Sequence, residues 1–297
     1  MKIIVTHSSP DWDAISSAWF IKRYLPGWEN AEVQFVPAGQ RIAPFKGDSA
    51  IEKIGDNDVI HVDTGMGPLD HHQTSDKHTS AASLSWEYVQ QRNQEFVNPI
   101  SEKIKDRIEA ITRMVNILVD IDHFGEVFWE NPAADYHEFS LLGVLEGLKV
   151  ARPNQDSFYV NFGFECLDAL LHDFENRVWA ENEIKKGLEF TTSFGKAIAF
   201  ETMNDTVIKL SQKMGYVLVV RKDPRKGYVR IKARPQTETE KGIDLTLVYE
   251  QLSKMDPHAT WFLHVSKKML LNGTPKNPKM IPTTLTLKQI VDVVKTL

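Results

Sequence analysis

Aspartate and histidine recur at short intervals in the first quarter of this chain, in a pattern that could bind metal ions. One group follows an apolar run at the N-terminus, one aspartate ends a later apolar run, and a triplet comes soon after. Carboxylates and imidazoles together suit divalent ions of the Mn²⁺ class. Two such ions about 3.5–4 Å apart can hold a phosphate ester and activate water for in-line attack. The residues concerned are His7, Asp11, Asp13, Asp63, Asp70, His71 and His72.

His7, Asp11 and Asp13 lie where a strand is expected to give way to a helix. Three ligands on one such turn can converge on a single point, and the amino end of the helix favours anionic groups there. Taken alone, Asp13 is typical of a helix cap and Asp11 of a turn. Together with His7 and the later motif, they favour metal binding.

Asp63 ends an otherwise hydrophobic run, so its carboxylate is expected to be buried. A buried carboxylate without a partner is costly, and a cation is the expected partner; a turn or cap carboxylate is the alternative. Neighbouring histidines point to opposite sides in an extended chain, so we expect only one of the pair to bind metal. We assign His71 to the metal, and His72 to orienting a ligand, contacting phosphate or carrying a proton.

A further carboxylate ligand for the metal ions is expected in the sequence Asp120-Ile-Asp122-His123. The apolar residues of 108–118 repeat at helical spacing and define a buried face. Extending this periodicity puts Asp122 on the buried face and Asp120 off it. Asp122 is therefore the predicted ligand and Asp120 the alternative, while His123 either supports a ligand or faces solvent.

The elements that would position these residues are typical of an α/β domain. Strands alternate with helical patterns, which favours a largely parallel sheet, and ligands gather at the carboxyl ends of its strands. His7 follows the first expected strand and Asp63 ends the third, so both would lie at one edge. We expect strands at 3–6, 33–36 and 59–63, and helices at 13–24, 79–92 and 103–122.

The composition changes near Gly195, after a stretch from 138 to 194 with much helical character. We therefore expect 1–194 to form a catalytic metal-binding domain and 195–297 a smaller α+β domain that binds substrate. In the second domain, the patterns predict strands at 197–200, 216–220, 227–233 and 260–265, and helices at 245–255 and 287–294.

The bulk composition limits the classes of function. The chain has 297 residues, 42% of them hydrophobic, which is enough for two domains with cores. A net charge of −5 provides no basic field for long duplex nucleic acid. Cys166 is the only cysteine, so no intramolecular disulfide is expected. No apolar stretch suits a signal peptide or a membrane span, so a cytoplasmic enzyme is expected, and a homodimer is left open.

The order of these motifs resembles the DHH phosphoesterase superfamily. The match comprises a first motif ending at Ala14, a second at Asp63, a third at Asp70-His71-His72 and, less clearly, a fourth at Asp122. The short interval from Asp63 to Asp70 and the phrase at 261–266 resemble the MYG (melanocyte proliferating gene) exonuclease-like branch. Motif coverage is confined to about the first 125 residues.

The resemblance implies two domains with the site in the cleft between them, and two divalent ions, Mn²⁺ first and Mg²⁺ or Co²⁺ as alternatives. It implies that Asp63 bridges both ions in a catalytic role and that phosphoester or phosphoanhydride bonds are hydrolysed. One ion would be held by His7, Asp11 and Asp63, and the other by Asp13, Asp63, His71 and Asp122.

The chain departs from many nucleotide-cleaving members because it has no Gly-Gly-Gly-His loop. Lys267 and Lys268 occupy the nearest equivalent and are predicted to bind substrate phosphate, with a solvated loop as the alternative. Arg230 and Arg234 share a strand face and are assigned the same role, a charged outer face being the alternative.

Three functions remain open. The first is hydrolysis of phosphodiester bonds in nucleotides or short single-stranded oligonucleotides, exonuclease-like. The second is manganese-dependent hydrolysis of pyrophosphate or another small phosphate compound. The third is a non-catalytic regulatory protein that binds nucleotide or metal.

Overall fold

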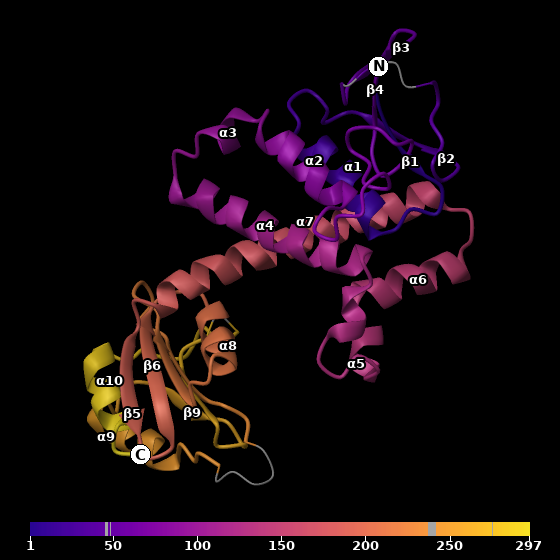
Figure 1. Ribbon diagram of the computed structural model, residues 1–297. Helices are drawn as coiled ribbons and strands as arrows, with labels where there is room; N and C mark the ends of the chain where they lie inside the picture. Colours follow the sequence, from indigo (N-terminus) through magenta and orange to yellow (C-terminus); the bar gives the residue numbers. More distant parts are fainter. Residues whose placement is uncertain (45–46, 48, 237–241, 275) are drawn as a thin grey trace. The chain divides into compact units, whose positions relative to one another are not determined.

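The computed structural model describes residues 1–44, 47, 49–236, 242–274 and 276–297 (Figure 1). The chain divides into two compact units, Met1–Glu175 (unit 1) and Asn176–Leu297 (unit 2), with the boundary inside the long helix α7 (Asp156–Ile184). Each unit contains one β-sheet together with helices, which confirms the α/β class. The division of function at residue 194 stays a prediction.

The sheet of unit 1 has the strand order β2-β1-β4-β3. The central strand β1 pairs in parallel with β2 and β4, and β3 joins β4 as an antiparallel edge. The sheet is therefore largely parallel, as predicted, although the short edge strand was not expected. The strands are β1 (Lys2–His7), β2 (Glu32–Val36), β3 (Glu52–Ile54) and β4 (Asn57–His61).

The apolar run of β1 is buried on both faces, as strands of parallel sheets usually are. Ile3 and Val5 pack with Val36 and Val59 on one side of the sheet. The helix α1 (Trp12–Tyr24) also contacts β1, and its residues from Trp12 to Ile21 are all buried.

The helices of unit 1 begin where side chains can cap them. Asp11 caps α1 by accepting from Ala14 N–H, and Ser80 caps α2 with a reciprocal bond to Ser83. Ser101 caps α4 by accepting from Ile104 N–H. The remaining elements are α2 (Ala81–Gln90), α3 (Gln94–Val97), α4 (Glu102–Asp122), a 3-10 turn (Gly125–Phe128), α5 (Asp135–Glu138) and α6 (Leu141–Ala151).

Unit 2 contains a six-stranded sheet in the order β5-β6-β7-β8-β10-β9. Strands β6 and β7 are parallel, and the other neighbours are antiparallel. The expected helical stretch up to residue 194 is wrong at its end, because β5 pairs with β6 there. The strands are β5 (Leu188–Thr192), β6 (Gly195–Glu201), β7 (Leu218–Lys222), β8 (Val229–Ala233), β9 (Trp261–Leu263) and β10 (Met269–Asn272).

Helices cover both faces of this sheet (Figure 1). On one face, α9 (Thr246–Met255) and α10 (Leu287–Val294) contribute to one core cluster. On the other face, α8 (Thr206–Lys213) and the last turns of α7 contribute to a second cluster. Within the described part of the chain, no helix combines the length and the apolar character needed to cross a membrane.

Candidate metal centre

The ends of two parallel strands bring the first ligands together. His7 is the last residue of β1, and Asp63 follows β4 in the same parallel pair. His7 Nε2 lies 3.2 Å from Asp63 Oδ2 and 3.8 Å from Asp11 Oδ2. Because Asp11 uses Oδ1 to cap α1, its other oxygen is the one that faces this group.

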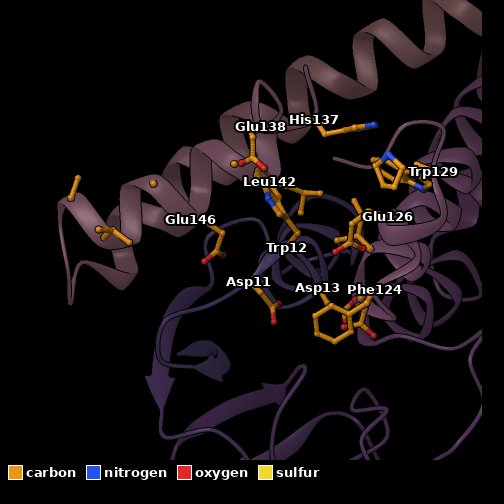
Figure 2. A pocket seen from close by; sticks show the side chains of 17 residues that line it. Asp11, Trp12, Asp13, Phe124, Glu126, Trp129, His137, Glu138, Leu142 and Glu146 are labelled. Carbon is orange, nitrogen blue, oxygen red and sulfur yellow. The ribbon is translucent and has the colours of Figure 1, made fainter. Parts of the chain in front are cut away.

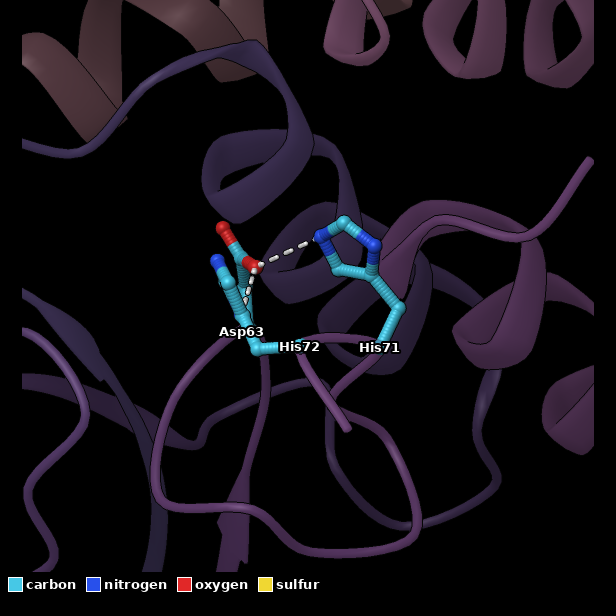
Figure 3. Close-up of side chains that lie close together, drawn as sticks. All are labelled: Asp63, His71 and His72. Atoms are coloured by element: carbon cyan, nitrogen blue, oxygen red, sulfur yellow. Dashed lines mark ion pairs between the residues drawn. The ribbon is translucent and has the colours of Figure 1, made fainter. Parts of the chain in front are cut away.

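Asp63 is the residue that most of the others approach. It is 3% exposed and has a positive φ of 51°, a conformation held in part by its N–H donating to Leu69 O. Its Oδ1 is buried and accepts no hydrogen bond from the described residues. That oxygen lies 3.7 Å from His71 Nε2 and 3.7 Å from His72 Nδ1 (Figure 3). A buried, under-satisfied carboxylate oxygen between imidazoles is suited to a cation.

Asp13 joins the group from the first turn of α1. Its two oxygens accept from the backbone N–H groups of Ala81 and Ala82, at the amino end of α2. Asp13 Oδ2 also lies 3.8 Å from His71 Nε2. The carboxylate is therefore fixed by the helix end, and each oxygen keeps a further lone pair for a ligand.

The end of α4 supplies Asp122 and His123. Asp122 Oδ2 is 3.5 Å from His71 Nε2 and 3.8 Å from His123 Nε2, and this oxygen has no hydrogen-bond donor among the described residues. Asp120 points elsewhere, because it accepts from the indole N–H of Trp129 at 2.6 Å. The structure thus brings Asp122 to the group and leaves the alternative, Asp120, outside it.

In an extended chain the side chains of His71 and His72 would point in opposite directions. In the structure they do not. The rings of His71 and His72 have centroids 4.5 Å apart, and both approach Asp63. The expectation was wrong because residues 72 and 73 form a turn. The buried Asp70 fixes this turn by accepting from the backbone N–H groups of Met66 and His72, and from His72 Nδ1 at 2.6 Å.

These residues form what we call the carboxylate–imidazole cluster. Three overlapping groups within it place potential ligand atoms within 4.8 Å of one another: His7 with Asp11 and Asp63, Asp63 with His71 and His72, and His71 with Asp122 and His123. Buried aspartate and histidine groups of this kind can hold a metal ion. The cluster comprises His7, Asp11, Asp13, Asp63, His71, His72, Asp122 and His123.

Burial and mutual repulsion disfavour negative charge in the cluster without a cation. Burial raises the pKa of Asp63 to about 6. Burial, followed by the charges of Asp63 and Asp122, raises the pKa of Asp13 well above its usual value. For His7, burial opposes protonation, but the hydrogen bond with Asp63 and nearby charges raise its pKa to about 9. These residues therefore fit a divalent ion, whose charge would relieve the repulsion.

The four cations predicted to bind substrate lie in unit 2, and three of them contact polar side chains there. Arg230 pairs with Asp205, Lys267 Nζ lies 3.1 Å from Asp244, and Lys268 Nζ donates to the Gln236 side chain at 2.7 Å. Arg234 also takes part in an interaction. A role for Arg230, Arg234, Lys267 and Lys268 in binding phosphate stays a prediction.

A cavity of about 800 Å³ adjoins the cluster within unit 1 and shares Asp11, Asp13 and Asp122 with it (Figure 2). Its other walls come mainly from 124–151, which the sequence did not single out. These wall residues lie on short helices and turns, so neither a strand end nor a helical period marked them. His123 was found in the sequence, but its role was left open.

Comparison with known proteins gives no family for this chain. No family model matches it, and no curated protein matches it. Among the solved structures that match, two align with 99% of this chain and with 98% of their own chains. One is an uncharacterized protein from Helicobacter pylori G27, with 13% identity and a TM-score of 0.24. The other is the pGpG-specific phosphodiesterase PggH from Vibrio cholerae, with 14% identity and a TM-score of 0.27. Likenesses this low support no assignment, so the function must be argued from the site itself.

Proposed function

We propose that this protein is a metal-dependent phosphoesterase that hydrolyses phosphodiester bonds of nucleotides or short oligonucleotides. The carboxylate–imidazole cluster is the observation that supports this most. Above all, the buried Oδ1 of Asp63 approaches two imidazoles and accepts no hydrogen bond from the described part of the chain. A site built only for stability would satisfy that oxygen internally. The resemblance of its motifs to the DHH superfamily supports the same reaction.

In this proposal the cluster holds two divalent ions, with Mn²⁺ as the first choice. The division of ligands follows the resemblance: His7, Asp11 and Asp63 hold one ion, and Asp63 is shared with the second. When bound, the ions would supply water activation near neutral pH and would offset the charge of the phosphate. The second ion would be held by Asp13, Asp63, His71 and Asp122, with His123 beside them.

His72 is suited to moving a proton. Its Nδ1 is engaged with Asp70 Oδ1, which fixes the ring orientation and leaves Nε2 to give or accept a proton. The side chain is 58% exposed, so Nε2 can exchange protons with solvent or substrate. Asp70 itself is held by backbone N–H groups and acts as the positioning residue for His72.

The neighbouring cavity favours an organic phosphate ester over pyrophosphate. Trp12, Phe124 and Trp129 line it, together with acidic side chains, and no lysine or arginine occurs among its described lining residues. Pyrophosphate carries several negative charges and would gain nothing from such walls. The leaving group of a phosphodiester, by contrast, has an apolar or flat portion that the aromatic side chains can contact.

Turnover of bis(p-nitrophenyl) phosphate with Mn²⁺ tests the proposal without assuming a nucleobase. We expect hydrolysis by the wild-type protein, loss of turnover in Asp63→Asn, and binding of two Mn²⁺ ions by titration calorimetry. The matched control is Asp56→Asn, an exposed aspartate of unit 1 that lies outside the cluster. It should keep both turnover and metal binding.

Three results would overturn the proposal. Equal turnover in the wild type and in Asp63→Asn would show that this cluster is not the active site. Mn²⁺ binding without turnover of either the generic ester or short oligonucleotides would favour the regulatory alternative. Phosphate release from pyrophosphate alone would favour the small-phosphate alternative.

A further inference from the structure

The cavity beside the cluster has walls of two kinds. Trp12, Phe124 and Trp129 provide aromatic surface, and Glu126, Glu138 and Glu146 provide carboxylates. Figure 2 shows Trp12 in the middle of these side chains, with Glu146 on one side and Glu126 on the other. We call this cavity of about 800 Å³ the acidic aromatic pocket; its volume is typical of sites for ligands of nucleotide size.

Glu126 is the carboxylate that distinguishes the pocket from a merely acidic surface. Its Oε2 is buried and has no hydrogen-bond donor among the described residues. Glu138 and Glu146 are exposed, and Glu146 already pairs with Lys149 at 3.2 Å. A buried acceptor without a donor costs free energy, and a ligand that brings an N–H group would recover it.

The segment that carries Glu126 and Trp129 is held in place by Asp120. Asp120 Oδ2 accepts from the Trp129 indole N–H at 2.6 Å, which closes the 3-10 turn Gly125–Phe128 against the end of α4. A Cβ at Gly125 would lie 1.9 Å from Asp120 Oδ1, so only glycine permits this close approach. The Asp120–Trp129 contact therefore holds this side of the pocket wall in place.

We propose that the acidic aromatic pocket holds a guanine base of the nucleotide substrate, with Glu126 accepting hydrogen bonds from the base edge. This deepens the proposed function and rests on it, since the phosphate of the same nucleotide would lie at the cluster. The shared residues Asp11, Asp13 and Asp122 make the two sites continuous. Aromatic side chains such as Phe124 and Trp129 provide faces on which a flat base can stack.

The chemistry of the base edges selects guanine among the common bases. Guanine presents two adjacent donors, N1–H and the N2 amino group, which match the two oxygens of one carboxylate. Adenine and cytosine each place a ring-nitrogen acceptor beside their amino group, and this acceptor would face the carboxylate. Uracil has a single N–H between two carbonyl acceptors. A carboxylate that lacks a donor therefore discriminates in favour of guanine.

Titration calorimetry with the mononucleotides GMP and AMP, in the presence of Mn²⁺, tests this proposal on the full chain. We expect GMP to bind at least about tenfold more tightly than AMP, the ratio that one hydrogen bond to a charged group supplies. In Glu126→Gln the ratio should fall below about threefold, because an amide replaces one acceptor with a donor. Phe124→Ala should weaken the binding of both nucleotides about tenfold and leave the ratio unchanged, because stacking does not depend on the hydrogen-bonding groups of the base edge.

Glu130→Gln is the matched control, because Glu130 is exposed on the same segment and does not line the pocket. It should keep the wild-type ratio, and circular dichroism should show that all three variants are folded. Equal affinities for GMP and AMP in the wild type, or an unchanged ratio in Glu126→Gln, would overturn the guanine assignment. Tighter binding of phosphocholine than of GMP would overturn it in favour of a cationic group over the aromatic faces.

The generic ester separates this failure from failure of the proposed function. If bis(p-nitrophenyl) phosphate is hydrolysed while GMP and AMP bind equally, the proposed phosphoesterase activity is supported and the guanine pocket is wrong. If GMP is preferred and Glu126→Gln removes the preference, but no ester is hydrolysed, the guanine pocket is supported and the proposed phosphoesterase activity is wrong.

Discussion

Asp63 in unit 1 and Asp256 in unit 2 are both buried carboxylates, 3% and 7% exposed, yet their surroundings differ. Asp256 Oδ2 accepts from the Thr283 hydroxyl at 2.8 Å, and from the backbone N–H and hydroxyl of Thr284 at 2.9 and 3.1 Å. These bonds, the backbone one foremost, lower the pKa of Asp256. Burial instead raises the pKa of Asp63 to about 6, and one of its oxygens has no donor among the described residues.

Arg221, a buried arginine of unit 2, also has its partners within that unit, although burial lowers its pKa. Arg221 is 5% exposed, and its guanidinium donates to Thr202 O at 2.9 Å and pairs with Asp205 at 2.8 Å. Asp205 also pairs with Arg230. The charges of Arg221 and Asp205 thus offset one another within unit 2, although Arg221 Nε makes no hydrogen bond with the described residues.

The difference between the two units shows where the chain gives up stability for ligand binding. A buried charge that serves the fold carries its partners with it, whereas the carboxylates of the cluster face one another, and Asp63 Oδ1 and Asp122 Oδ2 have no donor among the described residues. Such an arrangement costs stability until a ligand of opposite charge binds. Stability measurements with and without metal can therefore distinguish the two kinds of buried carboxylate.

The largest expected effect is stabilisation by metal. Because an ion that binds only the folded state adds RT ln(1 + [L]/Kd), Mn²⁺ at 100 times its Kd should raise the free energy of unfolding by about 2.7 kcal/mol. EDTA should reverse the gain, and Asp63→Asn should lose most of it. Urea unfolding followed by tryptophan fluorescence measures the change. An equal gain in Asp63→Asn and in the control Asp56→Asn would mean that the metal binds elsewhere.

The next effect concerns unit 2 and should not depend on metal. Asp256→Asn removes a charged acceptor from three hydrogen bonds, so we expect the free energy of unfolding to fall by about 2 kcal/mol. The Mn²⁺ affinity should stay the same. Glu250→Gln, an exposed change on α9, is the control and should have little effect. A loss of Mn²⁺ affinity in Asp256→Asn would show that Asp256, like Asp63, contributes to metal binding and does not serve the fold alone.

A smaller effect of opposite sign is expected at the cluster. Asp122→Asn removes a largely buried charge whose Oδ2 has no donor among the described residues, so the metal-free protein should gain about 1 kcal/mol of stability. The same substitution should weaken Mn²⁺ binding by more than about tenfold, as changes around metal sites commonly do. Calorimetric melting in EDTA and Mn²⁺ titration measure the two effects. Destabilisation in EDTA would assign Asp122 a structural role.

The sequence predicted most of what lies at strand ends and along regular helices. His7 and Asp63 were expected at one edge of a parallel sheet because carboxyl ends of parallel strands meet there. The helical period of α4 favoured Asp122 over Asp120, and the structure places only Asp122 at the cluster. Both inferences used short-range regularities of the backbone, which a sequence displays directly.

Contacts between distant segments could not be predicted in this way. Asp13 depends on the backbone N–H groups that begin α2, and Ala81 carries no sign of that contact. The predicted orientation of His71 and His72 was wrong because the chain forms a turn at these residues and is not extended. Glu126 lines the pocket on a segment that the Asp120–Trp129 hydrogen bond holds, and no periodic pattern in the sequence marks such a segment.

The smallest expected effect is a difference in pH dependence between the wild type and Asp256→Asn. The pKa of Asp256 is lower in the folded state than its unfolded value of about 3.9, so the folded state favours the ionised form. Its contribution is complete above the unfolded pKa and is lost as the pH falls through the lower folded pKa. From about pH 5 to about pH 3, the wild type should therefore lose more stability than Asp256→Asn.

Both proteins carry the same cluster in unit 1, so the acid titration of those carboxylates cancels in the difference. Urea unfolding at a series of pH values gives the free-energy gap between the wild type and Asp256→Asn, which should narrow as the pH falls. A gap that stays constant would mean that the charge of Asp256 contributes nothing, and that its threonine contacts act as neutral hydrogen bonds. In that case the surroundings of Asp256 would not favour its ionised form. Asp256 and Asp63 would then differ only in how their side chains are packed and hydrogen-bonded, and not in how the protein stabilises their charge.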